Sequence, residues 1–158
     1  MNYHRIESTN LSNGLGWRVV LWVSGCEHHC KGCHNPETWD YNSGKFFGKK
    51  ELHKLLDFMC SPHIKGLTIS GGDPLAPQNR MDILEILKVV KGEFPYKDVW
   101  LYTGYTYEEV QDLEIMKYVD VVVDGKFEIE NRDITLPFRG SSNQRIIYTE
   151  NFNGSSKT

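Results

Sequence analysis

Apolar residues gather along the chain in short dense runs that predict the strands of a buried sheet. Residues 17–24 are mostly β-branched, aliphatic or aromatic on both faces, as in a strand that is covered on both sides. Similar runs at 66–70, 98–102 and 119–123 predict three further strands, and a shorter run at 146–148 predicts a last one.

The stretches between these runs carry the spacing of amphipathic helices. Across 49–60, leucine and methionine recur at i, i+3, i+4 and i+7. The same spacing begins at Ile83 and continues until Gly92, where we expect the helix to end. Thr106 and Glu109 match a capping box, which predicts the start of a third helix.

This alternation of strands and helices predicts the architecture. It implies right-handed crossovers and a parallel sheet with its helices outside. A complete eight-unit barrel needs about 250 residues, whereas this chain has 158. We therefore expect an α/β fold, an open, partial parallel β/α barrel, in a single domain over 1–150, with a polar and flexible tail over 151–158.

The unusual segments of the chain all begin where a predicted strand ends. They are residues 24–35, 71–74, 102–105 and 124–126. Ligands of such sheets gather at the carboxyl ends of the strands. The sequence therefore predicts that these four segments share one site.

Composition and charge limit the classes of partner that the chain can have. The formal net charge is −3 and there is no long basic run, which excludes the electrostatic pattern of a nucleic-acid binder. No apolar stretch is long enough to span a membrane, and the first residues lack the apolar core of a secretory signal. We expect a cytoplasmic protein with reduced thiols whose partners are small molecules or other proteins.

Three of the four cysteines lie within eight residues, in the pattern Cys26-x3-Cys30-x2-Cys33. In a reducing compartment such a cluster indicates a metal or redox site before a disulfide. Three thiolates from one short loop can hold a 4Fe–4S cluster and leave one iron open to an external ligand. Gly32 permits the tight turn before the third cysteine. Cys60 stands apart, and we expect it to be a small buried side chain and not a fourth ligand.

The open iron suggests a reaction. The amino and carboxylate groups of S-adenosylmethionine can chelate it, and an electron from the cluster can then break a carbon–sulfur bond. An alternative from the residues alone is a zinc module without catalytic activity, in which His34 or His29 completes a tetrahedral site. The histidine His28 is expected to be exposed or hydrogen-bonded and not a ligand.

Five motifs carry a resemblance to a known family. They are Cys26 to Cys33 followed by His34-Asn35-Pro36, then Ser70-Gly71-Gly72-Asp73-Pro74, Tyr102-Thr103-Gly104-Tyr105, Asp124-Gly125-Lys126-Phe127 and Phe138 to Arg145. With them the sequence resembles the radical S-adenosylmethionine superfamily, and more closely the anaerobic ribonucleoside-triphosphate reductase-activating proteins. The resemblance covers most of the chain and implies the partial-barrel fold of that superfamily.

The resemblance also implies how S-adenosylmethionine is bound. It implies that backbone at Gly71 and Gly72 approaches the methionine part, with Asp73 beside it; glutamate is frequent in relatives at that last position, so a backbone contact is the firmer expectation there. It implies that Thr103 positions the ribose or the methionine part. A simple strand-to-helix turn remains the alternative for the glycine motif.

Two further pairs are implied as contacts of the same molecule. His34 and Asn35 would lie near the adenine. Lys126 would meet a carboxylate or a ribose hydroxyl, and Asp124 would orient polar neighbours, with a solvated surface pair as the alternative for both. Residues 139–145 could contact the carboxylate or a protein partner, or form a polar loop that leads into the last strand.

The function that the resemblance implies is that of an oxidoreductase, a glycyl-radical-enzyme activating enzyme. A flavodoxin-like or other low-potential donor would reduce the cluster, and S-adenosylmethionine would be cleaved to make a glycyl radical on the large subunit of an anaerobic, class III ribonucleotide reductase. The cluster-binding and catalytic residues would be Cys26, Cys30 and Cys33. An activating enzyme for another glycyl-radical enzyme is the nearest alternative.

Overall fold

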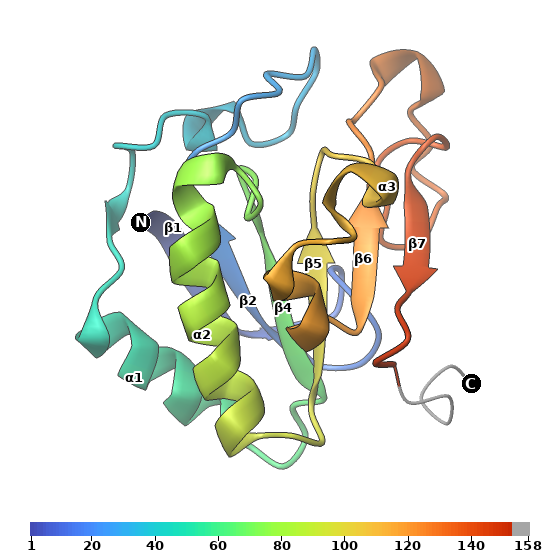
Figure 1. The fold of residues 1–158 in the computed structure, drawn as a ribbon. Coiled ribbons are helices and arrows are strands. Elements are labelled where there is room, and N and C mark those ends of the chain that lie inside the picture. Colours follow the sequence, from blue (N-terminus) through green and yellow to red (C-terminus); the bar gives the residue numbers. More distant parts are fainter. Residues whose placement is uncertain (153–158) are drawn as a thin grey trace.

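A computed structural model describes residues 1–152 and contains one seven-stranded sheet with helices packed against it (Figure 1). The strands are β1 (Asn2–Asn10), β2 (Arg18–Val23), β3 (Lys45–Phe46), β4 (Gly66–Gly71), β5 (Asp98–Tyr102), β6 (Val121–Asp124) and β7 (Arg145–Tyr148). The sheet order is β3-β1-β2-β4-β5-β6-β7. The sheet ends at β3 and β7, so it is open and not a closed barrel.

The centre of the sheet confirms the predicted α/β arrangement, and its edges correct it. β2, β4, β5 and β6 are parallel and adjacent in chain order. β1, β3 and β7 are antiparallel to their neighbours, so the sheet is mixed and not wholly parallel. β1 was not expected, because its residues are mostly polar and only partly buried, as suits a strand near an edge.

The two long helices follow the apolar spacing. They are α1 (Lys49–Met59) and α2 (Arg80–Glu93), which continues one residue past Gly92. The third helix is shorter than the pattern suggested: α3 (Tyr107–Val110) makes one turn, and the 3-10 helix η3 (Glu114–Tyr118) follows it. The buried residues Val110, Ile115 and Met116 do not lie on one helical stripe, which explains the break.

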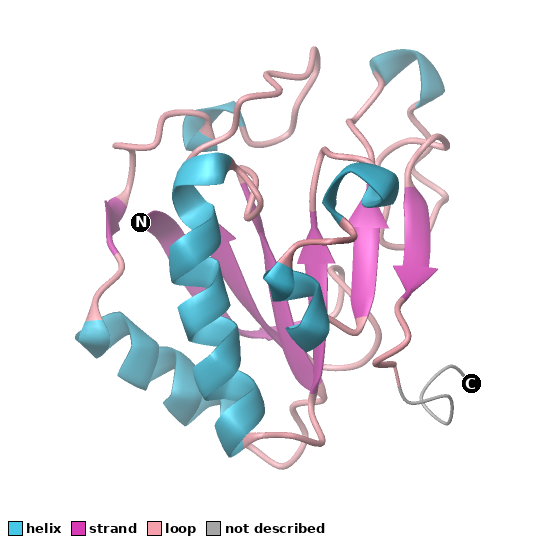
Figure 2. Cartoon of the chain, viewed as in Figure 1, coloured by secondary structure: helices cyan, strands magenta, loops and turns pink. Residues whose placement is uncertain are grey.

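The main core lies between the sheet and its helices. α1, α2 and α3 all lie on one face of the sheet (Figures 1 and 2). Val99 and Leu101 of β5 pack on that face, whereas Trp100 points to the other. There Trp100 forms a smaller apolar cluster with Val121, Val123 and Phe152.

Two residues of the expected tail pack against this fold. Phe152 is buried, and the Asn151 side chain donates hydrogen bonds to the carbonyls of Met116 and Val119 at 2.8 and 3.1 Å. The rest of the predicted tail, 153–158, lies outside the described residues.

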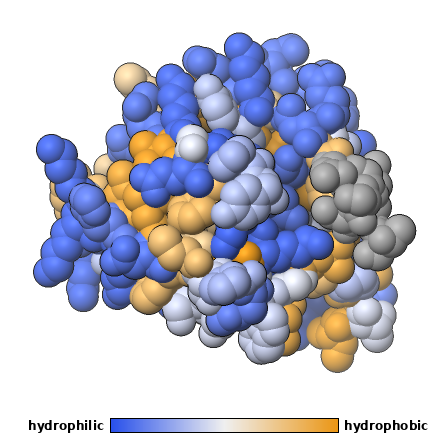
Figure 3. Space-filling view, turned by 90° about the horizontal axis from the view of Figure 1, so that it is seen from below, coloured by the Kyte–Doolittle hydropathy of each residue, from blue (hydrophilic) through white to orange (hydrophobic). Residues whose placement is uncertain are grey.

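Charged side chains pair with one another at the amino end of the parallel strands. Arg18 is completely buried and pairs with Asp98, with 2.5 Å between Nη2 and Oδ1. Lys91 pairs with Asp120 at 2.7 Å. Figure 3 shows this end of the molecule from below, with hydrophilic residues around smaller apolar areas. Within residues 1–152, no helix has the length and apolar character needed to cross a membrane.

Candidate functional site

A cavity of about 450 Å³ opens at the carboxyl ends of the parallel strands. Its walls come from the cysteine loop, the turn after β4, the turn after β5, the end of β6 and the segment that precedes β7. The predicted convergence of the unusual segments on one site is therefore confirmed, with Lys126 and Asp124 as exceptions described below.

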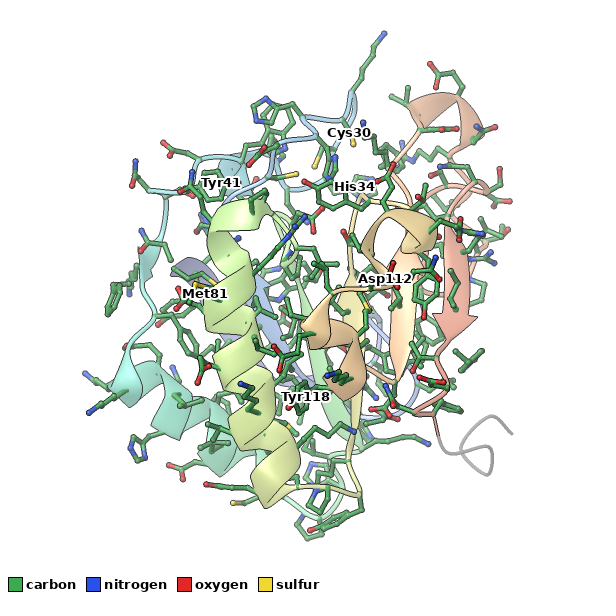
Figure 4. The ribbon with its side chains drawn as sticks, in the orientation of Figure 1. Cys30, His34, Tyr41, Met81, Asp112 and Tyr118 are labelled. Atoms are coloured by element: carbon green, nitrogen blue, oxygen red, sulfur yellow. The ribbon has the colours of Figure 1, made fainter. Side chains whose placement is uncertain are left out.

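All three clustered cysteines line this cavity. Cys26, Cys30 and Cys33 are free thiols of intermediate exposure, and Cys30 and His34 lie above the strand ends in Figure 4. A turn joins the last two cysteines, in which the Cys33 N–H donates to the Cys30 carbonyl at 3.1 Å. Gly32 has a φ of +78°, and a Cβ there would lie 2.7 Å from Ile129 Cδ1. The turn thus requires glycine, as predicted.

The loop and its neighbours modify the acidity of two thiols. Burial raises the pKa of the Cys26 thiol, and the backbone N–H groups of His28 and His29 oppose this rise. Burial also raises the pKa of the Cys30 thiol, against which the backbone at Phe127 and the charge of Lys126 act. A thiolate at either position is therefore met by donors or positive charge that the chain already supplies.

Cys60 lies far from this loop. It is exposed at the end of α1, so the expectation of a buried side chain is wrong. The residues on either side of Cys60 are held to the amino end of β5, where Lys97 donates to the carbonyls of Met59 and Ser61. Cys60 is therefore at the opposite end of the sheet, and only the three loop cysteines can contribute thiolates to the cavity.

The histidines of the loop have other contacts. His28 is hydrogen-bonded to Asp73, as expected for a residue that is not a ligand. His29 stacks on Trp39 with ring centroids 4.5 Å apart, and His34 lies 5.2 Å from the ring of Phe127. In the described part of the chain, no three His, Cys, Asp or Glu side chains are grouped to hold a single metal ion.

The glycine turn after β4 brings backbone into the cavity wall. Gly71 has a φ of +115°, and a Cβ on Gly72 would lie 2.5 Å from the Gly25 carbonyl oxygen. The N–H of Asp73 donates to that same carbonyl at 2.7 Å. Glycine is thus needed because this turn packs directly against the start of the cysteine loop.

The side chains of Asp73 and Thr103 bind each other. Asp73 is 1 % exposed, and its Oδ2 accepts hydrogen bonds from Thr103 Oγ1, the Gly104 N–H and His28 Nε2. Its Oδ1 accepts from the Leu75 N–H. Both residues line the cavity as predicted, but the Asp73 carboxylate is occupied by the chain itself.

The remaining predicted contacts divide into two groups. His34 and Asn35 line the cavity, and the Asn35 N–H donates to Cys33 Sγ at 3.4 Å. Asp124 and Lys126 are not among the lining residues. Asp124 is buried, and its carboxylate accepts from the Tyr107 N–H and pairs with Arg145. Its observed contacts hold β6 to α3 and β7, and it is not a solvated surface group.

Two cavity residues were not predicted as individual contacts. Arg139 Nε and Trp39 Nε1 are buried and have no hydrogen-bond partner among residues 1–152, and both residues line the cavity. Arg139 forms no ion pair with the described residues. The only sequence signal was the donor-rich segment 139–145; Trp39 gave none. Buried donors without partners fit a cavity that takes a ligand with acceptor groups.

Comparisons with known proteins agree with the cysteine chemistry. A family model described as "4Fe-4S single cluster domain" matches residues 12–147. An anaerobic ribonucleoside-triphosphate reductase-activating protein of Enterobacteria phage T4 is 47 % identical over 146 residues, which cover 92 % of this chain and 93 % of the relative. Proteins of the same name from Vibrio cholerae and Escherichia coli K12 are 45 % and 43 % identical over 150 residues, which cover 92 % of this chain and 97 % of each relative.

Proposed function

The chain belongs to the family of anaerobic ribonucleoside-triphosphate reductase-activating proteins, and from this we propose that it is an activating enzyme that makes a glycyl radical on its target. The target would be the large subunit of an anaerobic, class III ribonucleotide reductase. The cosubstrate would be S-adenosylmethionine, and the electron would come from a flavodoxin-like or other low-potential donor.

The observation that carries the proposal is the arrangement of the three thiols. Cys26, Cys30 and Cys33 come from one loop and line one cavity, and the fourth cysteine is at the opposite end of the sheet. This donor set fits a 4Fe–4S cluster with one iron left open. Such a cluster would bind the amino and carboxylate groups of S-adenosylmethionine and supply one electron, which splits the sulfonium into methionine and a 5′-deoxyadenosyl radical that takes a hydrogen atom from the target glycine.

The rest of the cavity would hold and orient the cosubstrate. Backbone at Gly71 and Gly72 would approach the methionine ammonium. Arg139 would meet the carboxylate, since its guanidinium lines the cavity and has a donor without a partner. Backbone at His34 and Asn35 would lie along the adenine.

Three of the predicted contact residues would act through neighbouring residues of the chain and not by touching the cosubstrate themselves. Thr103 would orient the cosubstrate through the turn that it forms with Asp73. Lys126 would act on Cys30, whose thiolate its charge favours, and Asp124 would support the neighbouring loop through Arg145. The open sheet would leave room for a loop of the target to reach the cavity, as a reaction at near-contact distance requires.

The test is anaerobic incubation of the reconstituted protein with a reductant, S-adenosylmethionine and a candidate class III reductase, followed by electron paramagnetic resonance. The expected result is a glycyl doublet that is absent when the target glycine is replaced by alanine. A radical on another glycyl-radical enzyme alone would redirect the proposal to that enzyme. A colourless zinc protein that is indifferent to S-adenosylmethionine would overturn it.

A further inference from the structure

The side chain of His28 joins the cysteine loop to the ends of two strands. It is 7 % exposed, and its Nε2 lies 2.6 Å from Oδ2 of Asp73. His28 stands between Cys26 and Cys30, whereas Asp73 follows the glycine turn of β4. The contact therefore ties the segment that carries the thiols to the rigid part of the fold.

Asp73 is fixed independently of this contact. Thr103 Oγ1 and the Gly104 N–H donate to the same Oδ2 at 3.1 and 2.9 Å, and the Leu75 N–H donates to Oδ1 at 2.9 Å. These donors come from the end of β5 and from the chain that leads to α2. Three donors besides His28 thus hold the carboxylate.

The residues that pack against the His28 ring fix its position. It meets the ring of Tyr105 edge to face, with centroids 4.6 Å apart. Gly104 lies directly beneath it, since a Cβ on that glycine would be 2.4 Å from His28 Cδ2. Glycine at this position is therefore part of the contact, because any side chain would displace the ring.

We propose that His28 and Asp73 are positioning residues that fix the cysteine loop in the conformation in which its three thiolates bind one cluster. This inference rests on the proposed function, because it assigns the cluster to these thiols. Fixing the loop favours cluster binding for a geometric and an entropic reason. A loop held in advance does not have to be ordered when the cluster binds, and the backbone N–H groups of His28 and His29 then face Cys26.

The neighbouring histidine provides a matched control. His29 is exposed and stacks on Trp39, and none of the described carboxylates pairs with it. Its φ is +48°, so asparagine, which tolerates this conformation, is the suitable replacement. His29→Asn therefore removes an imidazole from the same loop and leaves the contact with Asp73 intact.

The experiment compares reconstituted wild type, His28→Ala, His28→Gln, Asp73→Asn and His29→Asn under anaerobic challenge with an iron chelator. We expect His28→Ala to lose its iron and sulfide at a roughly 10-fold lower chelator concentration, the size of effect seen when outer partners of metal ligands are removed. Asp73→Asn should weaken retention less. His28→Gln should restore part of it, because its amide can still donate to the carboxylate. His29→Asn should behave as wild type.

Two further measurements separate positioning from general stability. His28→Ala should lower the thermal midpoint of the metal-free protein, because a buried hydrogen bond is lost, but the variant should remain folded by circular dichroism at the temperature of the chelator assay. The electron paramagnetic resonance signal of its reduced cluster should be broader than that of wild type. Equal chelator resistance of His28→Ala and wild type, or the absence of any rescue by His28→Gln, would overturn the inference. The proposed function fails separately, when the wild-type cluster does not respond to S-adenosylmethionine.

Discussion

At the amino end of the parallel strands the chain satisfies its own charges, whereas at the carboxyl end it leaves polar atoms without partners. Arg18 donates to Thr68 and Asp98 in a completely buried position, and Lys91 pairs with Asp120. Around the cavity, by contrast, three thiols are free and Arg139 Nε has no acceptor in the described part of the chain.

The difference shows which end is built for a ligand. An unpaired buried charge or donor costs stability, so the donors left without partners at the carboxyl end fit a cavity that binds a ligand, whereas the charges at the amino end are already paired. The same strands, the same helices and the same core support both ends. Substitutions at the amino end should therefore change stability, and substitutions at the carboxyl end should change ligand binding.

The largest expected effect is at the carboxyl end. Replacing Cys26, Cys30 or Cys33 singly by alanine should abolish cluster binding and cleavage of S-adenosylmethionine, because two thiolates cannot hold the cluster in the open arrangement. The unfolding free energy of the metal-free protein should change by less than about 0.5 kcal/mol, since the thiols lie on a partly exposed loop.

Cys60→Ala is the matched control for the cysteine series. It removes an exposed thiol at the other end of the sheet and should leave iron content and cleavage at wild-type levels. Full cleavage by any one of the three loop variants would contradict the assignment of the ligands.

The next effect belongs to the amino end. Arg18→Met should lower the unfolding free energy by about 3–5 kcal/mol, because it leaves Asp98 in a buried site without its cation. Urea unfolding of the metal-free protein at pH 7 measures this. The double variant with Asp98→Asn should recover part of the loss. A loss below about 1 kcal/mol would show that this end is not held by its ion pair.

A smaller effect is expected at the cavity, on the binding of S-adenosylmethionine. Arg139→Gln should weaken binding of S-adenosylmethionine to the reconstituted protein about 10-fold, or about 1.4 kcal/mol, because a charge-assisted hydrogen bond to the carboxylate is lost. Calorimetry under anaerobic conditions measures the affinity. Arg132→Gln, which removes an exposed cation from the same connection between β6 and β7, should have no effect. Equal affinities of wild type and Arg139→Gln would mean that another group holds the carboxylate.

The sequence predicted the parts of the fold that depend on local pattern. β2, β4, β5 and β6 are dense apolar runs, and α1 and α2 have one apolar face, so their positions followed from spacing. β1 could not be found in this way, because it is mostly polar, with Tyr3 and Ile6 as its apolar contacts to the core, and it is held mainly by pairing with β2. The capping box of Thr106 and Glu109 predicted the start of α3 but not its length, because Val110, Ile115 and Met116 do not lie on one helical stripe.

The site, too, could be predicted from the sequence only in part. The cysteine spacing and the strand ends predicted which segments meet, but not which side chains satisfy each other. His28 and Asp73 are 45 positions apart, and Arg18 and Asp98 are 80. Such contacts depend on how the sheet is assembled, as do the positions of Asp124 and Lys126 outside the cavity lining.

The smallest effect lies between the two ends, where Glu7 supports a wall of the cavity from the edge of the sheet. Trp22, which lines the cavity, donates its indole N–H to Glu7 at 2.7 Å. Burial acts to raise the pKa of Glu7, but hydrogen bonds from Asn10, Trp22 and Arg5 outweigh it, so the pKa is below its usual value. A carboxylate with a lowered pKa adds stability above its unfolded pKa and loses it as the pH falls through the folded value.

Glu7→Gln should therefore be less stable than wild type at pH 7 by about 0.5–1 kcal/mol, a modest difference because the side chain is partly exposed. The difference should shrink as the pH falls below the usual carboxyl range, since protonated glutamate and glutamine then make similar contacts. Urea unfolding of both proteins at pH 7 and pH 3 measures it. The exposed Glu85→Gln should show almost no difference at either pH. If the difference in unfolding free energy between wild type and Glu7→Gln stayed constant with pH, the negative charge of Glu7 would not be what stabilises the cavity wall at Trp22.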